Sequence, residues 1–144
     1  MRVTYKGDYS LKAIVTLAEL PAGQVSTIHD LSSKLDIPIK FLEQVLLGLK
    51  NGGFLASRRG KNGGYYLARK ATDITVADVL RFVDGPLVPI ACVDPCYIGC
   101  NDVSICPIRP VFQKVNIAIN EVVTNITIKD IIDSRPKLGD AYSI

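Results

Sequence analysis

The chain has 144 residues, 48% of them hydrophobic, and a formal net charge of +3 at pH 7. That length is typical of one domain with a substantial core, and the hydrophobic content excludes an intrinsically disordered chain. No apolar run approaches the ~20 residues of a membrane-spanning helix. The charged first residues also lack the apolar segment of a secretory signal. We therefore expect a cytoplasmic protein with no membrane partner.

The charged residues are divided unevenly along the chain. Residues 1–70 contain eleven Lys and Arg residues and five Asp and Glu residues, whereas residues 71–144 contain six and nine. A basic first half indicates an anionic partner for that half, unless the asymmetry is chance variation on an ordinary solvated surface.

Two helices are predicted before residue 35. Apolar residues at i, i+3, i+4 and i+7 predict an amphipathic helix over 8–20, and the Pro-Ala-Gly sequence at 21–23 ends it. Ser26 or Thr27 can serve as the N-cap of a second, shorter helix that ends near Lys34.

A third helix and a hairpin follow. Pro38 is expected in the first turn of a helix that ends near Asn51. Two short helices joined by a few residues outline a helix-turn-helix. The next residues are expected to form strands over 54–58 and 65–68, and Asn-Gly at 62–63 is a strong hairpin signal. A hairpin after the third helix makes a winged helix-turn-helix.

The second half is expected to contain three helices and one irregular stretch. A helix over 73–85 has Thr75 as its N-cap. Residues 86–110 are rich in proline, so most of this stretch cannot form regular structure. A long helix follows Pro110, and residues 127–133 form one or two further turns. The predicted fold class is mainly α with a small β-hairpin wing, a winged helix-turn-helix followed by a long C-terminal dimerisation helix.

The helix-turn-helix and its wing carry a candidate nucleic-acid site. The exposed N-terminal residues of the second short helix in such a motif contact base edges in the major groove. Gln can pair with adenine, Glu can accept from cytosine, and wing cations can contact the minor groove or phosphate. Simple solvation is the alternative for each charge. The residues expected to contact double-stranded DNA are Lys40, Glu43 and Gln44, with Ile39 beside them, and Arg58, Arg59 and Lys61.

The long helix is apolar over much of its surface, so it must be buried. Packing on its own small domain is one arrangement. Packing against the same helix of a second copy covers more surface and gives a symmetric homodimer, which we expect. The chain then divides into a DNA-binding winged helix-turn-helix domain (1–85), a cysteine-rich loop (86–107), a dimerisation helix with a short final helix (108–135) and a flexible tail (136–144).

All four cysteines of the chain lie within fifteen residues, at Cys92, Cys96, Cys100 and Cys106. Disulfide bonds, metal ligation and a thiol redox switch are three explanations, and a reducing cytosol disfavours the first. Thiolates favour iron–sulfur clusters, zinc and copper(I). Structural zinc sites usually combine two separated cysteine pairs, and no second group is present here. The residues alone leave a cluster, zinc and a redox switch open.

Four stretches of the chain are similar to one bacterial family. They are MRVTYKGDYSLKAIVTLA, FLEQVLLGLKNGGFLASRRGKNGGYYLAR, ITVADVLRFVDG and ITIKDIID. From residue 1 to about residue 133 the chain resembles the Rrf-two family of bacterial winged-helix repressors. The resemblance implies a homodimer that binds a palindromic operator. It also implies that the cysteines hold an iron–sulfur cluster whose state controls the affinity for DNA.

The resemblance also implies a ligand set. Family members with a cluster carry three cysteines, the last two separated by five residues, and Cys92, Cys100 and Cys106 match that pattern. Cys96 is additional, and it is either a substitute for one of the first two or a fourth ligand. In some relatives a carboxylate from the first helix of the opposite subunit is the fourth ligand, and Asp8 holds the corresponding place. The other role of Asp8 is a charge at a helix N-terminus. The cluster type, 2Fe–2S or 4Fe–4S, stays open.

Catalysis is not expected. His29 is the only histidine, and a position in the second helix suits a surface residue or a phosphate contact better than a metal ligand. The chain therefore offers no Cys/His or Ser/His arrangement, and it lacks a nucleotide-binding glycine motif. The alternative to a cluster-dependent regulator is a family member without a cluster that responds to thiol oxidation or to a metabolite.

Overall fold

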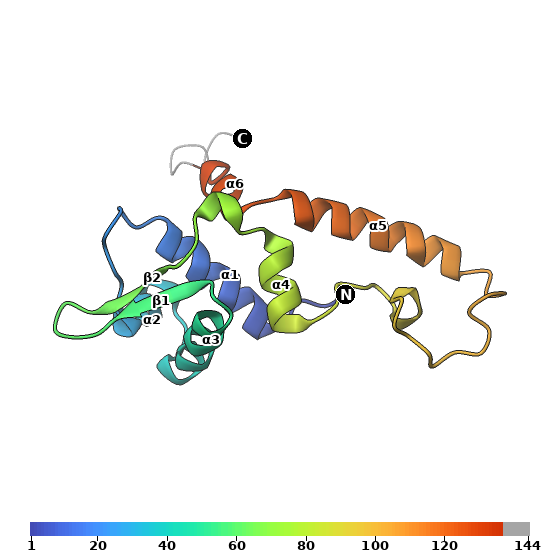
Figure 1. Ribbon diagram of the computed structural model, residues 1–144, viewed down its shortest axis with the longest axis horizontal. Helices are drawn as coiled ribbons and strands as arrows, with labels where there is room; N and C mark the ends of the chain where they lie inside the picture. Colours follow the sequence, from blue (N-terminus) through green and yellow to red (C-terminus); the bar gives the residue numbers. More distant parts are fainter. Residues whose placement is uncertain (137–144) are drawn as a thin grey trace.

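The computed structural model describes residues 1–136, so the predicted tail (136–144) lies almost entirely outside the described residues. Figure 1 shows a head made of helices and one hairpin, from which a loop and a long helix extend to one side. This mainly helical arrangement with an antiparallel hairpin confirms the predicted fold class. None of the described helices is long and apolar enough to cross a membrane. The elements in chain order are α1 (Tyr5–Ala18), α2 (Ile28–Leu35), α3 (Ile39–Asn51), β1 (Leu55–Arg58), β2 (Gly64–Leu67), the 3₁₀ helix η1 (Ala71–Asp73), α4 (Val76–Asp84), the 3₁₀ helix η2 (Ala91–Val93), α5 (Arg109–Asn125) and α6 (Ile128–Asp133).

The first helix begins earlier than its apolar pattern predicts. Thr4 is its N-cap, and the Thr4 hydroxyl accepts a hydrogen bond from the Gly7 N–H at 3.0 Å. The predicted start at residue 8 was therefore wrong by one turn, because the capping residue lies before the first apolar position. The buried face of α1, which includes Ala13, Ile14 and Leu17, lies in the centre of the head.

The helix-turn-helix forms as predicted, with one correction at its turn. Thr27 caps α2, since its hydroxyl accepts from the Asp30 N–H at 3.1 Å. Asp36 takes the left-handed conformation (φ 54°) and ends α2. Pro38 precedes α3 as its N-cap instead of lying within the first turn. Its carbonyl accepts from the Leu42 N–H at 3.0 Å, so the proline begins the helix without needing a donor of its own.

The wing is a short antiparallel hairpin in which Leu55 pairs with Leu67 and Arg58 pairs with Gly64. Its tip is closed by a hydrogen bond from the Gly63 N–H to the Gly60 carbonyl at 3.0 Å. A Cβ atom at Gly63 would lie 2.3 Å from the Arg58 carbonyl oxygen, so only glycine fits this tight turn. The glycine therefore fixes the shape of the loop that presents the wing cations.

The last helix belongs to the packing of the head, although sequence order groups it with the dimerisation helix. Ile128 in α6 is fully buried in the same apolar cluster as Ile14 and Ile74. Two backbone hydrogen bonds of 2.9 Å join the start of α6 to the start of α4, from the Val76 N–H to the Ile126 carbonyl and from the Ile128 N–H to the Ile74 carbonyl. The chain between these points leaves the head after α4 and returns to it along α5 (Figure 1).

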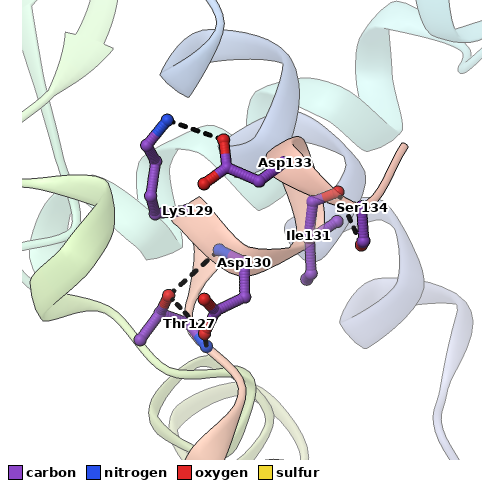
Figure 2. Close-up of polar contacts among 6 residues, drawn as sticks. All are labelled: Thr127, Lys129, Asp130, Ile131, Asp133 and Ser134. Carbon is purple, nitrogen blue, oxygen red and sulfur yellow. Dashed lines mark hydrogen bonds and ion pairs between the residues drawn. The ribbon is translucent and has the colours of Figure 1, made fainter. Parts of the chain in front are cut away.

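Both joined helix starts are capping boxes. Figure 2 shows the one at α6, where the Thr127 hydroxyl accepts from the Asp130 N–H at 3.1 Å and the Asp130 carboxylate accepts from the Thr127 N–H at 2.9 Å. Thr75 and Asp78 make the same reciprocal pair at α4. The backbone and hydroxyl donors of Thr127 lower the pKa of Asp130 below its usual value, because they stabilise the ionised carboxylate.

The capping box predicts an acid-dependent contribution to stability. The folded state holds the pKa of Asp130 below that of the unfolded chain, so its contribution is complete above about pH 4 and is lost as the pH falls through the lowered pKa. Asp130→Asn keeps an acceptor but cannot titrate. We expect urea unfolding of this variant to lose less stability than the wild type between about pH 5 and pH 3. Parallel pH profiles for Asp130→Asn and the wild type would refute the assignment.

Candidate nucleic-acid interface and cysteine loop

The outer face of α3 carries the predicted base-contacting residues. Leu42, Val45, Leu46 and Leu49 are buried against the head, and this orients the opposite face of the helix toward solvent. The predicted contact residues Lys40, Glu43 and Gln44 are exposed, whereas Ile39 is half-buried. Neither of the two charged residues, Lys40 and Glu43, takes part in an ion pair within residues 1–136. Their side chains are therefore available to a partner.

Two exposed apolar side chains on α3 were not predicted. Phe41 is 58% exposed and Leu47 is 57% exposed, next to the polar residues of the same face. Phe41 packs edge-on against Tyr9 of α1, with 6.5 Å between the ring centroids. The periodicity that identifies the buried face of α3 also places these residues outside it, so their exposure could have been read from the same pattern.

The cations of the wing form no ion pair within residues 1–136. Arg58, Arg59 and Lys61 are exposed, and residues 54–70 contain no acidic side chain. The Arg58 guanidinium lies 5.9 Å from the centroid of the Tyr66 ring on the paired strand. This cation–π contact orients one of the three cations, while the other two remain on the hairpin tip.

The basic surface continues beyond the predicted wing residues. A cleft of about 440 Å³ between the end of α1 and the wing is lined by Arg58, Arg69 and Lys70, with Tyr66 beside them. Arg69 donates a 2.7 Å hydrogen bond to the Asp73 carbonyl and lies 5.6 Å from the Phe54 ring centroid. Arg69 and Lys70 follow β2 after one intervening residue, Ala68, so their proximity to the wing could have been predicted.

The four cysteines lie on one loop, which we call the cysteine loop (residues 85–108), between α4 and α5. All four thiols are free; Cys92 and Cys106 are half-buried, whereas Cys96 and Cys100 are exposed. Apart from η2 the loop has no helix or strand. Within residues 1–136, no three His, Cys, Asp or Glu side chains are gathered closely enough to hold a metal ion. The donor chemistry suits a soft metal or a cluster, but one chain as described does not assemble the ligand cage.

The predicted partner ligand Asp8 lies apart from any assembled site. Its carboxylate pairs with Lys12 one helical turn later at 2.6 Å, and its side chain remains 44% exposed. Asp8 also lines a surface cleft with Arg2 and Tyr5. His29 is exposed in the first turn of α2, as expected for a surface residue. Asp8 thus forms a local ion pair, and within residues 1–136 it belongs to no group of three side chains that could hold a metal ion.

The long helix α5 leaves an apolar stripe uncovered. No residue of this helix is buried within one chain. One side contacts α4, whereas three valines that share another side of the helix are 39–59% exposed. These are Val111, Val115 and Val122. Exposed apolar surface of this kind is typical of sites where protein surfaces interact.

Comparison with known proteins gives a consistent result. A family model named Rrf2, described as "Iron-dependent Transcriptional regulator", matches residues 3–134. The chain is 33% identical over 138 residues to an rrf2-like HTH-type transcriptional regulator of Rhodobacter capsulatus, covering 90% of this chain and 91% of that one. It is 28% identical over 134 residues to protein rrf2 of Nitratidesulfovibrio vulgaris, covering 92% and 87% of the two chains.

Solved structures share the fold. CymR, described as the global cysteine regulator of B. subtilis, superposes with a TM-score of 0.79 at 24% identity, over 94% of this chain and 99% of that one. IscR of T. potens superposes with a TM-score of 0.74 at 26% identity, over 99% and 97% of the two chains. The winged-helix arrangement of this chain is thus found along nearly its whole length in other regulators.

Proposed function

Because the chain belongs to the Rrf2 family of transcriptional regulators, we propose that it acts as a homodimeric repressor whose affinity for a palindromic operator is set by an iron–sulfur cluster in the cysteine loop. Members of the family are DNA-binding regulators and not enzymes. The observation that carries the cluster proposal is the gathering of all four free thiols on one irregular loop between α4 and α5.

The loop supplies a suitable donor set. Cys92, Cys100 and Cys106 are the proposed thiolate ligands, with Cys96 as the alternative and Asp8 of a second chain as the candidate fourth ligand. A bound cluster can change its redox state, react with nitric oxide or be lost when iron is scarce. The cysteine loop has few backbone hydrogen bonds, so it can close around a cluster and reopen when the cluster is lost.

Two exposed elements of the head, α3 and the wing, are the proposed DNA-binding surface. In the proposed complex the exposed face of α3 enters the major groove, where Gln44 and Glu43 contact base edges and Lys40 lies near phosphate. In the same complex the wing cations contact the flanking DNA backbone or the minor groove. Two heads joined through α5 must meet half-sites one helical turn apart, so a change in the cysteine loop that alters head spacing changes the affinity.

A second candidate function is direct thiol sensing without a cluster. Two observations favour it: Cys96 and Cys100 are exposed, and the thiols are not gathered as a cage within one chain. A two-electron oxidant such as a peroxide would then accept two electrons and two protons from two of the thiols, and the resulting disulfide would rearrange the same loop. Both candidates place the signal in the cysteine loop and differ in what the thiols bind.

Purification under strict anaerobic conditions distinguishes the two candidates. We expect the wild type to contain iron and acid-labile sulfide in equal amounts and to show a visible absorption band. Cys106→Ala should abolish both, whereas Cys96→Ala should retain both if Cys96 is not a ligand. Wild-type protein without iron and sulfide, whose DNA affinity changes on thiol oxidation, would exclude the cluster and support direct thiol sensing.

A further inference from the structure

The first part of the cysteine loop is attached to α5 at two backbone carbonyls. Asn120 donates from its side-chain amide to the Leu87 carbonyl at 3.0 Å. Arg109 donates from Nε to the Cys92 carbonyl at 3.1 Å. Residues 87–92 are thus held along α5, so the first proposed thiolate ligand has a fixed relation to the long helix. The Cys96 N–H, in contrast, bonds only to the nearby Asp94 carboxylate, at 2.9 Å.

The same Asn120 side chain joins the loop to α4. Its carbonyl oxygen accepts from the Arg81 guanidinium at 2.8 Å, and Arg81 also contacts the Thr124 hydroxyl at 3.3 Å. Leu87 is buried in a small apolar cluster with Ala77 and Leu80 of α4, with Val123 of α5 packed against it. One amide of α5 therefore contacts both α4 and the start of the loop that follows α4, which lie 39 and 33 residues earlier in the sequence.

The helix α4 in turn lies directly behind the DNA-binding elements. Phe82 packs on Phe54 before the wing, with 5.4 Å between ring centroids. A Cβ atom at Gly52, the residue after α3, would lie 2.5 Å from the Phe82 ring. The Phe82 ring thus occupies the space that a side chain at position 52 would need, so α4 contacts both the end of α3 and the residue before the wing.

We propose that Asn120 and Arg81 are positioning residues that transmit the state of the cysteine loop to the DNA-binding head. Movement of Leu87 breaks the hydrogen bond from the Asn120 amide or reorients that side chain. Arg81 then loses its acceptor, and α4 changes its position against Gly52 and Phe54. The coupling runs within one chain and does not depend on whether the loop holds a cluster or reacts through thiols. It rests on the proposed function only in placing the signal in the cysteine loop.

Asn120→Asp tests this coupling with almost no change of shape. The carboxylate still accepts from Arg81 but cannot donate to the Leu87 carbonyl. Asn125→Asp, at the exposed end of α5, makes the same chemical change outside the junction. Each protein is assayed for affinity toward a duplex selected by the wild type from random DNA, first as anaerobically purified and then after removal of metal or oxidation of thiols.

The quantity compared is the ratio of the two affinities. A wild-type ratio in the usual allosteric range of about 5–150 should fall to within about twofold of unity in Asn120→Asp and stay unchanged in Asn125→Asp. Hydrogen exchange of residues 86–93 in the metal-free reduced protein should become faster in Asn120→Asp alone. If Asn120→Asp does not fold, Arg81→Gln carries the same expectation for the ratio.

The outcomes separate the two proposals. A wild type with equal affinities in both states refutes the proposed sensing function. A wild type with a large ratio that Asn120→Asp and Arg81→Gln both retain leaves sensing in place and refutes this route of transmission.

Discussion

Replacing Arg58, Arg59 and Lys61 together by alanine is expected to weaken binding to the selected duplex by roughly 100-fold or more at about 0.15 M salt. All three cations are exposed on the wing, and residues 54–70 offer no acidic partner to neutralise them. Each cation that neutralises a phosphate contributes about 0.9 to the slope of log affinity against log salt, so the slope should fall by up to about 2.7 per wing, or about 5.4 for the proposed dimer with its two wings. Titrations by fluorescence anisotropy at several salt concentrations measure both quantities.

A matched variant separates a wing contact from a general effect of net charge. Lys114, Lys129 and Arg135 are three cations outside α3 and the wing, and their replacement by alanine removes the same charge. We expect this triple variant to keep the wild-type salt slope and to lose little affinity. An equal loss in both triple variants would show that the wing makes no specific contact with DNA.

The second large effect concerns the apolar stripe of α5. Val115→Asp combined with Val122→Asp places two charges on the side of α5 that no element within residues 1–136 covers. If a second copy covers it, burial of these charges is prohibitive and the protein becomes a monomer. A single head then binds one half-site, and the affinity should fall by about 10²–10⁴-fold because the second contact is no longer intramolecular. Light scattering and DNA titration report the two results.

Two acidic substitutions on polar positions of the same helix provide the control. Gln113→Asp and Asn125→Asp add the same charge to α5 but leave the valines intact, so the dimer and the DNA affinity should persist. A dimer that survives Val115→Asp with Val122→Asp would place the interface elsewhere and contradict the role proposed for α5.

The parts of the fold that the sequence predicts well are those with local signals. Three helix starts are marked by a threonine whose hydroxyl accepts from the N–H three residues later, at Thr27, Thr75 and Thr127. These starts can therefore be predicted from a few neighbouring residues. The Asn-Gly turn predicts the wing for the same reason. The start of α1 was missed because Thr4 precedes the first apolar position, and Pro38 was placed one residue too far into its helix.

The parts that the sequence does not predict depend on partners far along the chain. Arg81 and Asn120 are 39 residues apart, and neither sequence neighbourhood indicates a hydrogen bond between them. The burial of Ile128 in the head likewise follows from packing against α1 and from backbone pairing with Ile74, not from its own short helix. For the candidate site, sequence places the residues on elements, whereas the junction that connects loop, α5 and α4 emerges only in three dimensions.

Ile128 belongs to the core of the head but lies near the C-terminal end of the described chain, so it is synthesised after the rest of that core. Ribosomes synthesise the chain from its N-terminus, so residues 1–85 emerge well before the residue that fills the centre of their core. The head can complete its folding only after the cysteine loop and α5 have also been synthesised. A chain that stops before α6 retains an open core and becomes a substrate for proteases. Premature termination therefore does not leave the cell with a stable DNA-binding head that lacks its cysteine loop.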